Sequence, residues 1–374
     1  MDLIAEMLSD HLAREHAECF EVELVRPRFI WPSSHRSQKI TNERWFAAAK
    51  LFNRFAVYPR WIARNRARFD IFHIVDHSYS HLIHHLPADR CVVTCHDLDT
   101  FKCLLEPDIE NRSWAFRAMT RRIFAGFRKA ARVNCGSSAT RDDVVRRGII
   151  PSERLEVVPN GVHPIFTAVA DPDADAEICR LLRRRSIDSI EILHVGSTQP
   201  RKRIDLLLRI FAAVRANLPA ARLIRVGGGL TKRDQGLAEQ LGVSDAITIL
   251  PFMERRILAA AYRRADVLVL PSDAEGFGLP IIEALACGVP VIASDLPVLR
   301  EVGGNAVRYC AVEDVDAWSS AIAEVIRERD ADGHARLERR ALATAQASRF
   351  SWSANAKRAT QVYLALLDRA KPRA

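Results

Sequence analysis

The chain has 374 residues, which is enough for two domains of ordinary size. Its 48% hydrophobic and 27% charged residues exclude a disordered or fibrous protein. No apolar run is long enough to span a membrane, and residues 1–10 lack the basic start and apolar core of a secretory signal. We therefore expect a cytoplasmic protein whose eight cysteines, none in a Cys-x-x-Cys pair, are reduced and mostly buried.

The chain opens on a helical pattern over residues 3–12. Short apolar runs then alternate with helical patterns, which predicts βαβ units and parallel sheets. The first half has runs at 20–25, 70–76, 91–96, 132–135 and 155–158, and the second half at 190–195, 221–226, 246–250, 266–270 and 289–293. A doubly wound domain normally opens with a strand and a glycine-rich loop, and neither precedes the first helix here. This leaves open whether the native start lies upstream of Met1.

The two halves meet near residues 159–177, where a Pro-Asn-Gly turn precedes an acidic run that we interpret as a linker. We expect an N-terminal Rossmann-like acceptor domain at 1–165, without its first strand and glycine loop. A donor domain follows at 166–350, and a helix at 351–374 returns to the first domain. Ligands of such sheets bind at the carboxyl ends of the strands, which predicts a site in a cleft between the domains.

Two segments of the first half combine basic and aromatic residues. Residues 26–68 are rich in Lys and Arg, contain one acid (Glu43), and have interleaved Trp, Phe and Tyr. This suits an anionic lipid surface, a phosphorylated acceptor or a nucleic acid, and a solvated helix face fits equally well. A helical pattern over 114–129 has arginines on its other face, which fits a core helix better than a membrane-surface helix.

The most informative segment is EGFGLPIIE at residues 275–283. Its glycines expose backbone N–H groups, Pro280 suits the first turn of a helix, and Gly288 ends that helix. A helix N-terminus binds anions, and the carboxylates of Glu275 and Glu283 can accept hydrogen bonds from sugar hydroxyls. The pattern fits a nucleotide sugar, although a plain capped helix fits it as well.

This segment resembles the Glu-x7-Glu signature of retaining GT-B glycosyltransferases, and with the following EALACGVPV it resembles glycosyltransferase family 4. The resemblance implies that Glu275 contacts the donor hexose and that Glu283 holds the ribose hydroxyls. It also implies that the backbone from Gly276 through Phe277, Gly278 and Leu279 faces the sugar and diphosphate.

Four further segments match the same family. Residues 194–202, HVGSTQPRK, resemble its Gly-x-x-x-Pro-Arg-Lys motif, which implies that Arg201 and Lys202 neutralise the leaving diphosphate beside Gly196. Ser197 stands where many members have Arg. The glycine turn beginning at Gly227 and the pair Phe252 and Met253 resemble the parts that border the donor and its base. His96, at the end of a predicted strand, is implied to contact the donor sugar near the reacting carbon, although a lone His is more often structural.

Metal-dependent chemistry is a weaker interpretation. Two Asp-x-Asp pairs occur, at 97–99 and 173–175, but GT-B enzymes generally use cations and a helix dipole instead. The spacing of Cys91, Cys95, His96 and Cys103 fits no usual zinc site. We therefore expect no metal and no cofactor beyond the donor itself. The histidines between 73 and 85 are expected to be structural or to border the acceptor.

The sequence thus predicts an α/β protein with the GT-B architecture: two Rossmann-like domains across a cleft, with a C-terminal helix crossing back. The expected activity is retaining transfer of a hexose, preferably mannose-like, to a hydroxyl of a glycan or polyprenyl-diphosphate-linked acceptor. Peripheral contact with the inner face of the cytoplasmic membrane is expected, and no nucleic-acid partner. A catalytically silent GT-B partner subunit and a nucleotide-sugar 2-epimerase remain alternatives.

Overall fold

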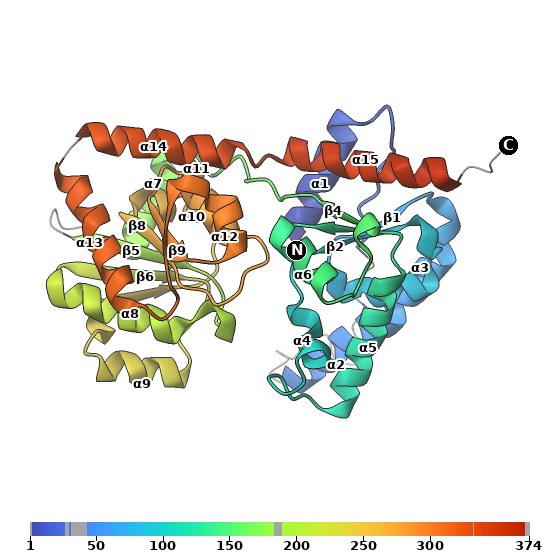
Figure 1. Cartoon of the computed structure of the whole chain (residues 1–374), viewed down its shortest axis with the longest axis horizontal. Coiled ribbons are helices and arrows are strands. Elements are labelled where there is room, and N and C mark those ends of the chain that lie inside the picture. The colour runs from blue at the N-terminus through green and yellow to red at the C-terminus, as the bar shows by residue number, and fades with distance from the viewer. Residues whose placement is uncertain (1, 27–29, 31–42, 183–188, 332, 371–374) are drawn as a thin grey trace, which may run out of the picture. The chain divides into compact units, whose positions relative to one another are not determined.

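The computed structural model describes residues 2–26, 30, 43–182, 189–331 and 333–370. The chain divides into two compact units, which we describe separately. Unit 1 comprises Met1–Pro159 and Ser353–Ala374, and unit 2 comprises Asn160–Trp352. Each is built on a parallel sheet with helices packed against it (Figure 1).

Unit 1 contains a four-stranded parallel sheet in the order β1-β2-β3-β4. Its strands are short and almost completely buried at the centre, as the continuous apolar run of β2 predicts. The strands are β1 (Phe72–Ile74), β2 (Cys91–Cys95), β3 (Arg132–Cys135) and β4 (Leu155–Val157). The helices are α1 (Asp2–Glu15), α2 (Glu43–Phe52), α3 (Tyr58–Asn65), α4 (Lys102–Leu105), α5 (Trp114–Lys129), α6 (Ser138–Arg146) and α15 (Trp352–Ala370).

Helix α15 returns from the end of unit 2 and packs on unit 1, as the sequence predicted (Figure 1). Leu8 and Leu12 of α1 share a buried apolar cluster with Val362 and Leu366 of α15. The hydroxyl of Ser353 also donates a 2.6 Å hydrogen bond to the carboxylate of Glu15. The last helix is therefore part of the core of unit 1.

Unit 2 contains a six-stranded parallel sheet in the order β10-β9-β8-β5-β6-β7. Strands β5 to β7 progress to one side and β8 to β10 to the other, so the topological switch point lies between β5 and β8. The strands are β5 (Ile190–Val195), β6 (Ala221–Val226), β7 (Ile247–Leu250), β8 (Val267–Leu270), β9 (Val291–Ser294) and β10 (Val307–Cys310). The helices are α7 (Pro172–Leu182), α8 (Ile204–Asn217), α9 (Lys232–Gln240), α10 (Arg255–Arg264), α11 (Leu279–Ala286), α12 (Pro297–Gly303), α13 (Val315–Ala331) and α14 (Gly333–Ser348).

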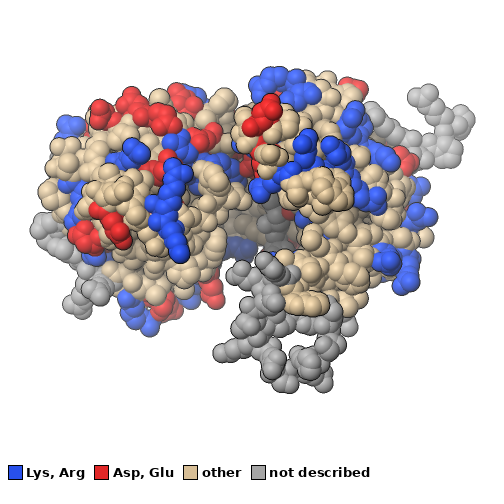
Figure 2. All heavy atoms as spheres, turned by 90° about the horizontal axis from the view of Figure 1, so that it is seen from below, with Lys and Arg blue, Asp and Glu red and all other residues tan. Residues whose placement is uncertain are grey.

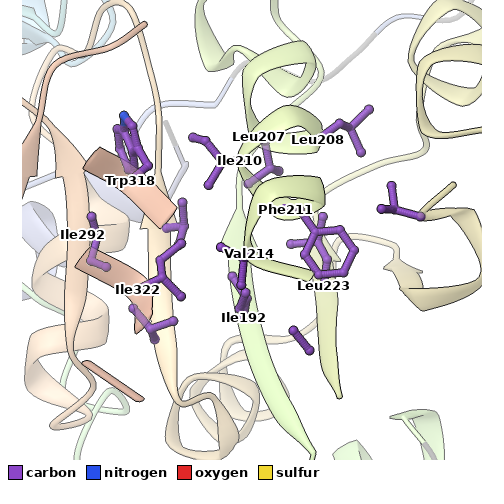
Figure 3. Close-up of a cluster of buried hydrophobic side chains, with 14 of the residues drawn as sticks. Ile192, Leu207, Leu208, Ile210, Phe211, Val214, Leu223, Ile292, Trp318 and Ile322 are labelled. Atoms are coloured by element: carbon purple, nitrogen blue, oxygen red, sulfur yellow. The ribbon is translucent and has the colours of Figure 1, made fainter. Parts of the chain in front are cut away.

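The core of unit 2 lies between its sheet and helices α8 and α13. Figure 3 shows Leu207, Phe211 and Val214 of α8 pointing toward side chains of the sheet, such as Ile192 and Leu223. Trp318 and Ile322 of α13 are fully buried in the same cluster. Burial of each of these side chains stabilises the folded unit by roughly 1.5–3 kcal/mol. This packing holds in place the sheet whose loops form the candidate site.

Two expectations from the sequence were wrong, and one strand was missed. Residues 20–25 form no strand, because among the described residues no neighbouring strand pairs with them. The strand β10 was missed because its four residues include Arg308 and Tyr309, which dilute the apolar pattern. The acidic run at 171–177 is the start of α7 rather than a linker. The Asp171 side chain accepts a hydrogen bond from the N–H of Ala174, so it supports the first turn of that helix.

Part of the basic and aromatic segment lies outside the described residues, including Trp31. Residues 43–68 are helical: α2 is followed by a π-helix at Asn53–Val57, by α3 and by a 3-10 turn at Arg66–Arg68. Trp45 and Phe52 are 66% and 52% exposed. Figure 2 shows Lys and Arg side chains gathered on part of the surface of unit 1. No helix among the described residues is long and apolar enough to cross a membrane.

Candidate donor site

The loop from β8 to α11 has a backbone shape that its glycines make possible. Gly278 caps α11 with φ +96°, and a Cβ atom there would come within 2.9 Å of the Leu299 side chain. No side chain caps the helix, and Pro280 occupies its first turn. Phe277 is buried edge-on against Phe350, with ring centroids 5.6 Å apart. This packing fixes the loop at the helix N-terminus, where a positive partial charge favours an anion.

Glu275 in this loop is held by two cations. Its side chain is only 6% exposed, and one carboxylate oxygen lies 2.5 Å from Nζ of Lys202. The other oxygen accepts a hydrogen bond from Arg201 at 3.2 Å, and the Ser272 hydroxyl donates to the first at 2.8 Å. These contacts orient the carboxylate. Arg201, Lys202 and Glu275 together carry a net charge of one positive unit.

The cations reach this position because the segment after β5 is tied to the segment after β8. The N–H of Asp273 donates to the carbonyl of Arg201 at 2.8 Å. Arg203 has φ +47°, the only positive φ of a non-glycine residue among those described. Its guanidinium forms ion pairs with Asp205, Asp273 and Glu313, which hold this unfavourable backbone conformation in place.

Two glycine turns meet next to these cations. Gly227 has φ +115°, and a Cβ atom there would lie 2.3 Å from the carbonyl oxygen of Gly196. The buried guanidinium of Arg225 donates to the carbonyls of Gly196, Ser197 and Gly228. The loops after β5 and β6 are therefore joined by one arginine, whose two terminal nitrogens donate to backbone carbonyls.

Phe252 lies beside the second glycine turn. It is 74% exposed, and its ring is 3.3 Å from the position that a Cβ atom of Gly227 would occupy. Met253 follows it and is half-buried. An exposed aromatic ring next to a glycine turn offers a flat apolar surface for a planar ligand group.

Glu283 is buried in α11. The hydroxyl of Tyr262 in α10 donates a 2.8 Å hydrogen bond to its carboxylate. Burial raises the pKa of Glu283 to about 7, against the opposing effect of this hydrogen bond. A carboxyl group in this state changes charge near neutral pH.

His96 belongs to unit 1, at the end of β2. It is buried, and its Nε2 lies 2.7 Å from the carbonyl oxygen of Val75, so this nitrogen donates. The N–H of His96 donates to Nδ1 of His77 at 3.4 Å. Burial lowers the pKa of His96, which favours the neutral imidazole at neutral pH.

The structure thus brings most of the predicted residues of unit 2 into one region around the switch point. Arg201 and Lys202 contact Glu275 directly, and Gly196 touches the Gly227 turn. Glu283 lies about one turn into α11, the helix that begins in this region. In the described part of the chain, no three His, Cys, Asp or Glu side chains gather in a way that could hold a metal ion.

Sequence reasoning missed four residues that support the site: Tyr262, Arg225, Arg203 and His194. His194 is fully buried under Gly196, and neither ring nitrogen has a hydrogen-bond partner among the described residues. Burial, with Arg225 and Lys202 nearby, lowers its pKa to about 3. The sequence feature that could have identified such residues is a charged or polar side chain within the apolar run of a strand, as with Arg225 in ARLIRV.

Several solved structures share this architecture. Sucrose-phosphate synthase of Thermosynechococcus elongatus is 23% identical, with a TM-score of 0.66 over 87% of this chain and 78% of its own. WaaG, a glycosyltransferase of lipopolysaccharide biosynthesis, is 16% identical, with a TM-score of 0.65 over 96% and 94%. Anabaena HepE, solved with UDP and glucose, is 18% identical, with a TM-score of 0.67 over 87% and 83%. The fold is therefore GT-B, as the sequence predicted.

Sequence comparison narrows this class to a family. A glycosyltransferase family 4 model matches residues 5–165, and a model of group 1 glycosyl transferases matches residues 184–344. The chain belongs to glycosyltransferase family 4.

D-inositol 3-phosphate glycosyltransferase of Mycolicibacterium smegmatis is 35% identical over 209 residues, which are 54% of this chain and 45% of that protein. The Thermobispora bispora protein of the same name is 36% identical over 234 residues, 59% and 52% of the two chains. The chain thus matches about half the length of these relatives.

Proposed function

We propose that the protein transfers a hexose from a nucleoside-diphosphate sugar to an acceptor hydroxyl, with retention at the anomeric carbon. The observation that supports this most directly is the contact of Lys202 and Arg201 with Glu275 at the start of α11. A diphosphate needs positive charge, and a hexose needs oriented hydrogen-bond acceptors. This arrangement supplies both within a few ångströms.

The surrounding residues suit the other parts of such a donor. Glu283, with its buried carboxylate held by Tyr262, accepts hydrogen bonds from the ribose hydroxyls. The exposed ring of Phe252, with Met253 beside it, borders the base, and the glycines at 196 and 227 admit the diphosphate close to the backbone. Glu275 contacts the hexose hydroxyls, and the backbone at 276–279 faces the sugar and diphosphate.

The reaction breaks the bond between the anomeric carbon and the diphosphate oxygen and forms a bond from the same carbon to the acceptor oxygen. The acceptor's proton passes to the departing diphosphate. In this mechanism no protein side chain acts as a covalent nucleophile. Arg201, Lys202 and the N-terminus of α11 stabilise the negative charge that develops on the diphosphate. The carbonyl of Val75 fixes the protonated nitrogen of His96, which leaves Nδ1 as an acceptor toward the donor sugar.

The known relatives supply concrete candidates for the substrates. HepE was solved with UDP-glucose, and the curated relatives are named as D-inositol 3-phosphate glycosyltransferases. We propose a nucleoside-diphosphate hexose, with a mannose-like sugar first, as the donor. We propose a glycan or a polyprenyl-diphosphate-linked sugar as the acceptor.

The decisive experiment measures nucleoside diphosphate release from GDP-mannose, UDP-glucose and UDP-N-acetylglucosamine, each with and without an acceptor. The acceptors are D-inositol 3-phosphate, a soluble oligosaccharide and a polyprenyl-diphosphate-linked sugar. Transfer predicts release that depends on an acceptor, with the anomeric configuration of the product unchanged by NMR. Release without any acceptor, together with an epimerised sugar, would instead identify an epimerase. No binding of any donor would identify a silent subunit.

A lipid-linked acceptor fits the surface of unit 1. Trp114 is 83% exposed at the start of α5, whose sequence also contains five Lys and Arg residues, namely Arg117, Arg121, Arg122, Arg128 and Lys129. Trp45 and Phe52 of α2 are also exposed. Aromatic rings beside cations favour the interface of an anionic bilayer.

We expect binding to phosphatidylglycerol vesicles that weakens several-fold in Trp114→Ala and does not weaken in Leu337→Ala, a substitution of an exposed residue of unit 2. Equal binding to neutral vesicles would contradict this proposal.

A further inference from the structure

Unit 2 has a cavity at the edge of its sheet that lies opposite the candidate donor site. The cavity has a volume of about 270 Å³ and is bordered by Asp266 and Pro290, which directly precede β8 and β9. The candidate donor residues instead follow the carboxyl ends of the strands. Gly288, just after the end of α11, also borders the cavity, and helix α14, which packs against α11, supplies another wall (Figure 1). We call this space the basal cavity.

Arginines from three helices border the basal cavity. Among the described residues that border it, Asp266 is the only acid. A recess with several guanidinium groups and one carboxylate attracts anions. The arginines are Arg263 of α10, Arg329 of α13, and Arg336, Arg339 and Arg340 of α14.

Two of these arginines are held by acids. Arg329 forms an ion pair with Asp266 at 3.0 Å, and Arg339 forms one with Glu328. The other carboxylate oxygen of Glu328 lies 2.5 Å from the guanidinium of Arg308. These two arginines are therefore part of the internal charge network of unit 2.

The other three arginines retain donors for a ligand. Arg263 pairs with Asp175 at 2.6 Å, but its Nε is buried and has no hydrogen-bond partner among the described residues. Arg340 donates to the carbonyl of Ala168 at 2.9 Å. In the described part of the chain, neither Arg340 nor the exposed Arg336 forms an ion pair. A guanidinium has five N–H donors, so most of those of Arg336 and Arg340 remain available.

Neutralisation of helix ends explains only part of this arrangement. Helices α10 and α11 end beside the cavity, and a helix C-terminus carries about half a negative charge. This suits Arg263, which lies in the last turn of α10. Arg336 lies instead in the first turn of α14, at the positive end of the helix dipole, which disfavours a cation. An anion bound in the cavity would offset this unfavourable charge.

We propose that the basal cavity binds a soluble small molecule that carries a phosphate or diphosphate group. A guanidinium forms paired hydrogen bonds with phosphate oxygens, and the cations around this cavity are arginines rather than lysines. Arg336 and Arg340 make the main contacts. A volume of about 270 Å³ suits a ligand smaller than a nucleotide sugar. Because the cavity lies at the opposite sheet edge from the candidate donor site, this ligand is distinct from the donor, and the proposal does not rest on the transfer reaction.

The test is a calorimetric titration of the chain with pyrophosphate in low-salt buffer. Arg336→Ala combined with Arg340→Ala should weaken binding about tenfold or more. Arg209→Ala combined with Arg233→Ala is the matched control, because it removes two exposed arginines of α8 and α9 in the same unit. The control should change the affinity less than about twofold. Equal melting temperatures of the variants and the parent would establish that each variant is folded.

Pyrophosphate also suits the proposed donor site, where Arg201 and Lys202 lie. The same substitutions are therefore repeated in the Lys202→Ala background. Pyrophosphate binding should remain in Lys202→Ala and should be lost when Arg336→Ala and Arg340→Ala are added. Hydrogen exchange measured by mass spectrometry should slow at residues 287–290 and 336–343 when pyrophosphate is added.

Three results would overturn the proposal. The first is that Lys202→Ala by itself removes all pyrophosphate binding. The second is equal weakening in the two paired variants, which would indicate general attraction to a basic surface. The third is binding to phosphatidic acid vesicles without binding to pyrophosphate, which would assign these arginines to a lipid headgroup. A chain without transfer activity would still give each of these readouts, so failure of the proposed function is distinguishable from failure of this site.

Discussion

The hydroxyl of Tyr262 donates a 2.8 Å hydrogen bond to the buried carboxylate of Glu283, joining helix α10 to helix α11. Burial raises the pKa of this carboxyl group to about 7, although the hydrogen bond from Tyr262 acts in the opposite direction. The charge of that group is therefore set by pH in the physiological range, and both stability and donor binding should respond to it.

Glu283→Gln should change the pH dependence of folding. The pKa of Glu283 is raised from 4.5 to about 7, so its contribution to stability is fully present below pH 4.5 and is lost as pH rises through 7. Urea unfolding should show that, between pH 4 and pH 8, the free energy of unfolding of the variant rises by up to about 3 kcal/mol relative to that of the parent.

In the parent, donor affinity should increase as pH rises through 7, because the carboxylate accepts the ribose hydrogen bonds. A parallel pH profile in both proteins would contradict the role of Glu283.

Lys202→Ala should slow transfer strongly. Loss of the cation beside Glu275 removes charge stabilisation of the leaving diphosphate, and kcat should fall about 100-fold, or roughly 3 kcal/mol in the barrier. Lys232→Ala is the matched control, since Lys232 is an exposed residue of α9 in the same unit. Steady-state kinetics with saturating donor provide the measurement. Wild-type rates in Lys202→Ala would refute the proposed mechanism.

Gly278→Ala should destabilise unit 2 and weaken donor binding. The residue has φ +96°, and the added Cβ would lie 2.9 Å from Leu299, so the loop must shift. We expect a loss of about 1–3 kcal/mol. Gly236→Ala is the control, because Gly236 lies within α9 with open space around it and should gain about 1 kcal/mol. Thermal unfolding and donor titration should separate the two variants, and equal melting temperatures would count against the argument.

Arg225→Met should raise the KM for the donor more than it lowers kcat. The variant removes the hydrogen bonds that hold the carbonyls of Gly196, Ser197 and Gly228, so the two glycine turns lose their common anchor. Arg222→Met, on the same strand and half-buried, should leave KM within about twofold. If both variants gave the same KM, Arg225 would have no positioning role.

The shape of the loop from β8 to α11 was predictable because its requirements are local. The glycines at 276 and 278, Pro280 and the glutamates at 275 and 283 lie within nine consecutive residues, so their spacing is visible in one segment. The contact of Lys202 with Glu275 was not visible, because it joins residues 73 positions apart through the adjacency of β5 and β8. Tyr262 and Arg225 were missed for the same reason.

The errors have a related cause. Residues 20–25 have the alternation of a strand, but a strand also needs a neighbour, and pairing is a property of the sheet. The acidic run at 171–177 looked like a linker, but Arg256 pairs with Asp171 and Arg263 with Asp175, so that α7 is held against α10. Local composition could not show these partners, which lie more than 80 residues away in the sequence.

The sequence by itself determined the fold class, the family and the helix start at residues 278–280, because periodicity and turn residues act over a few positions. Only the tertiary structure decided which charges meet, which carboxyl group is buried, and which arginines gather around the basal cavity. Those properties depend on strand order and burial, and strand order is fixed by packing among elements that lie far apart in the chain.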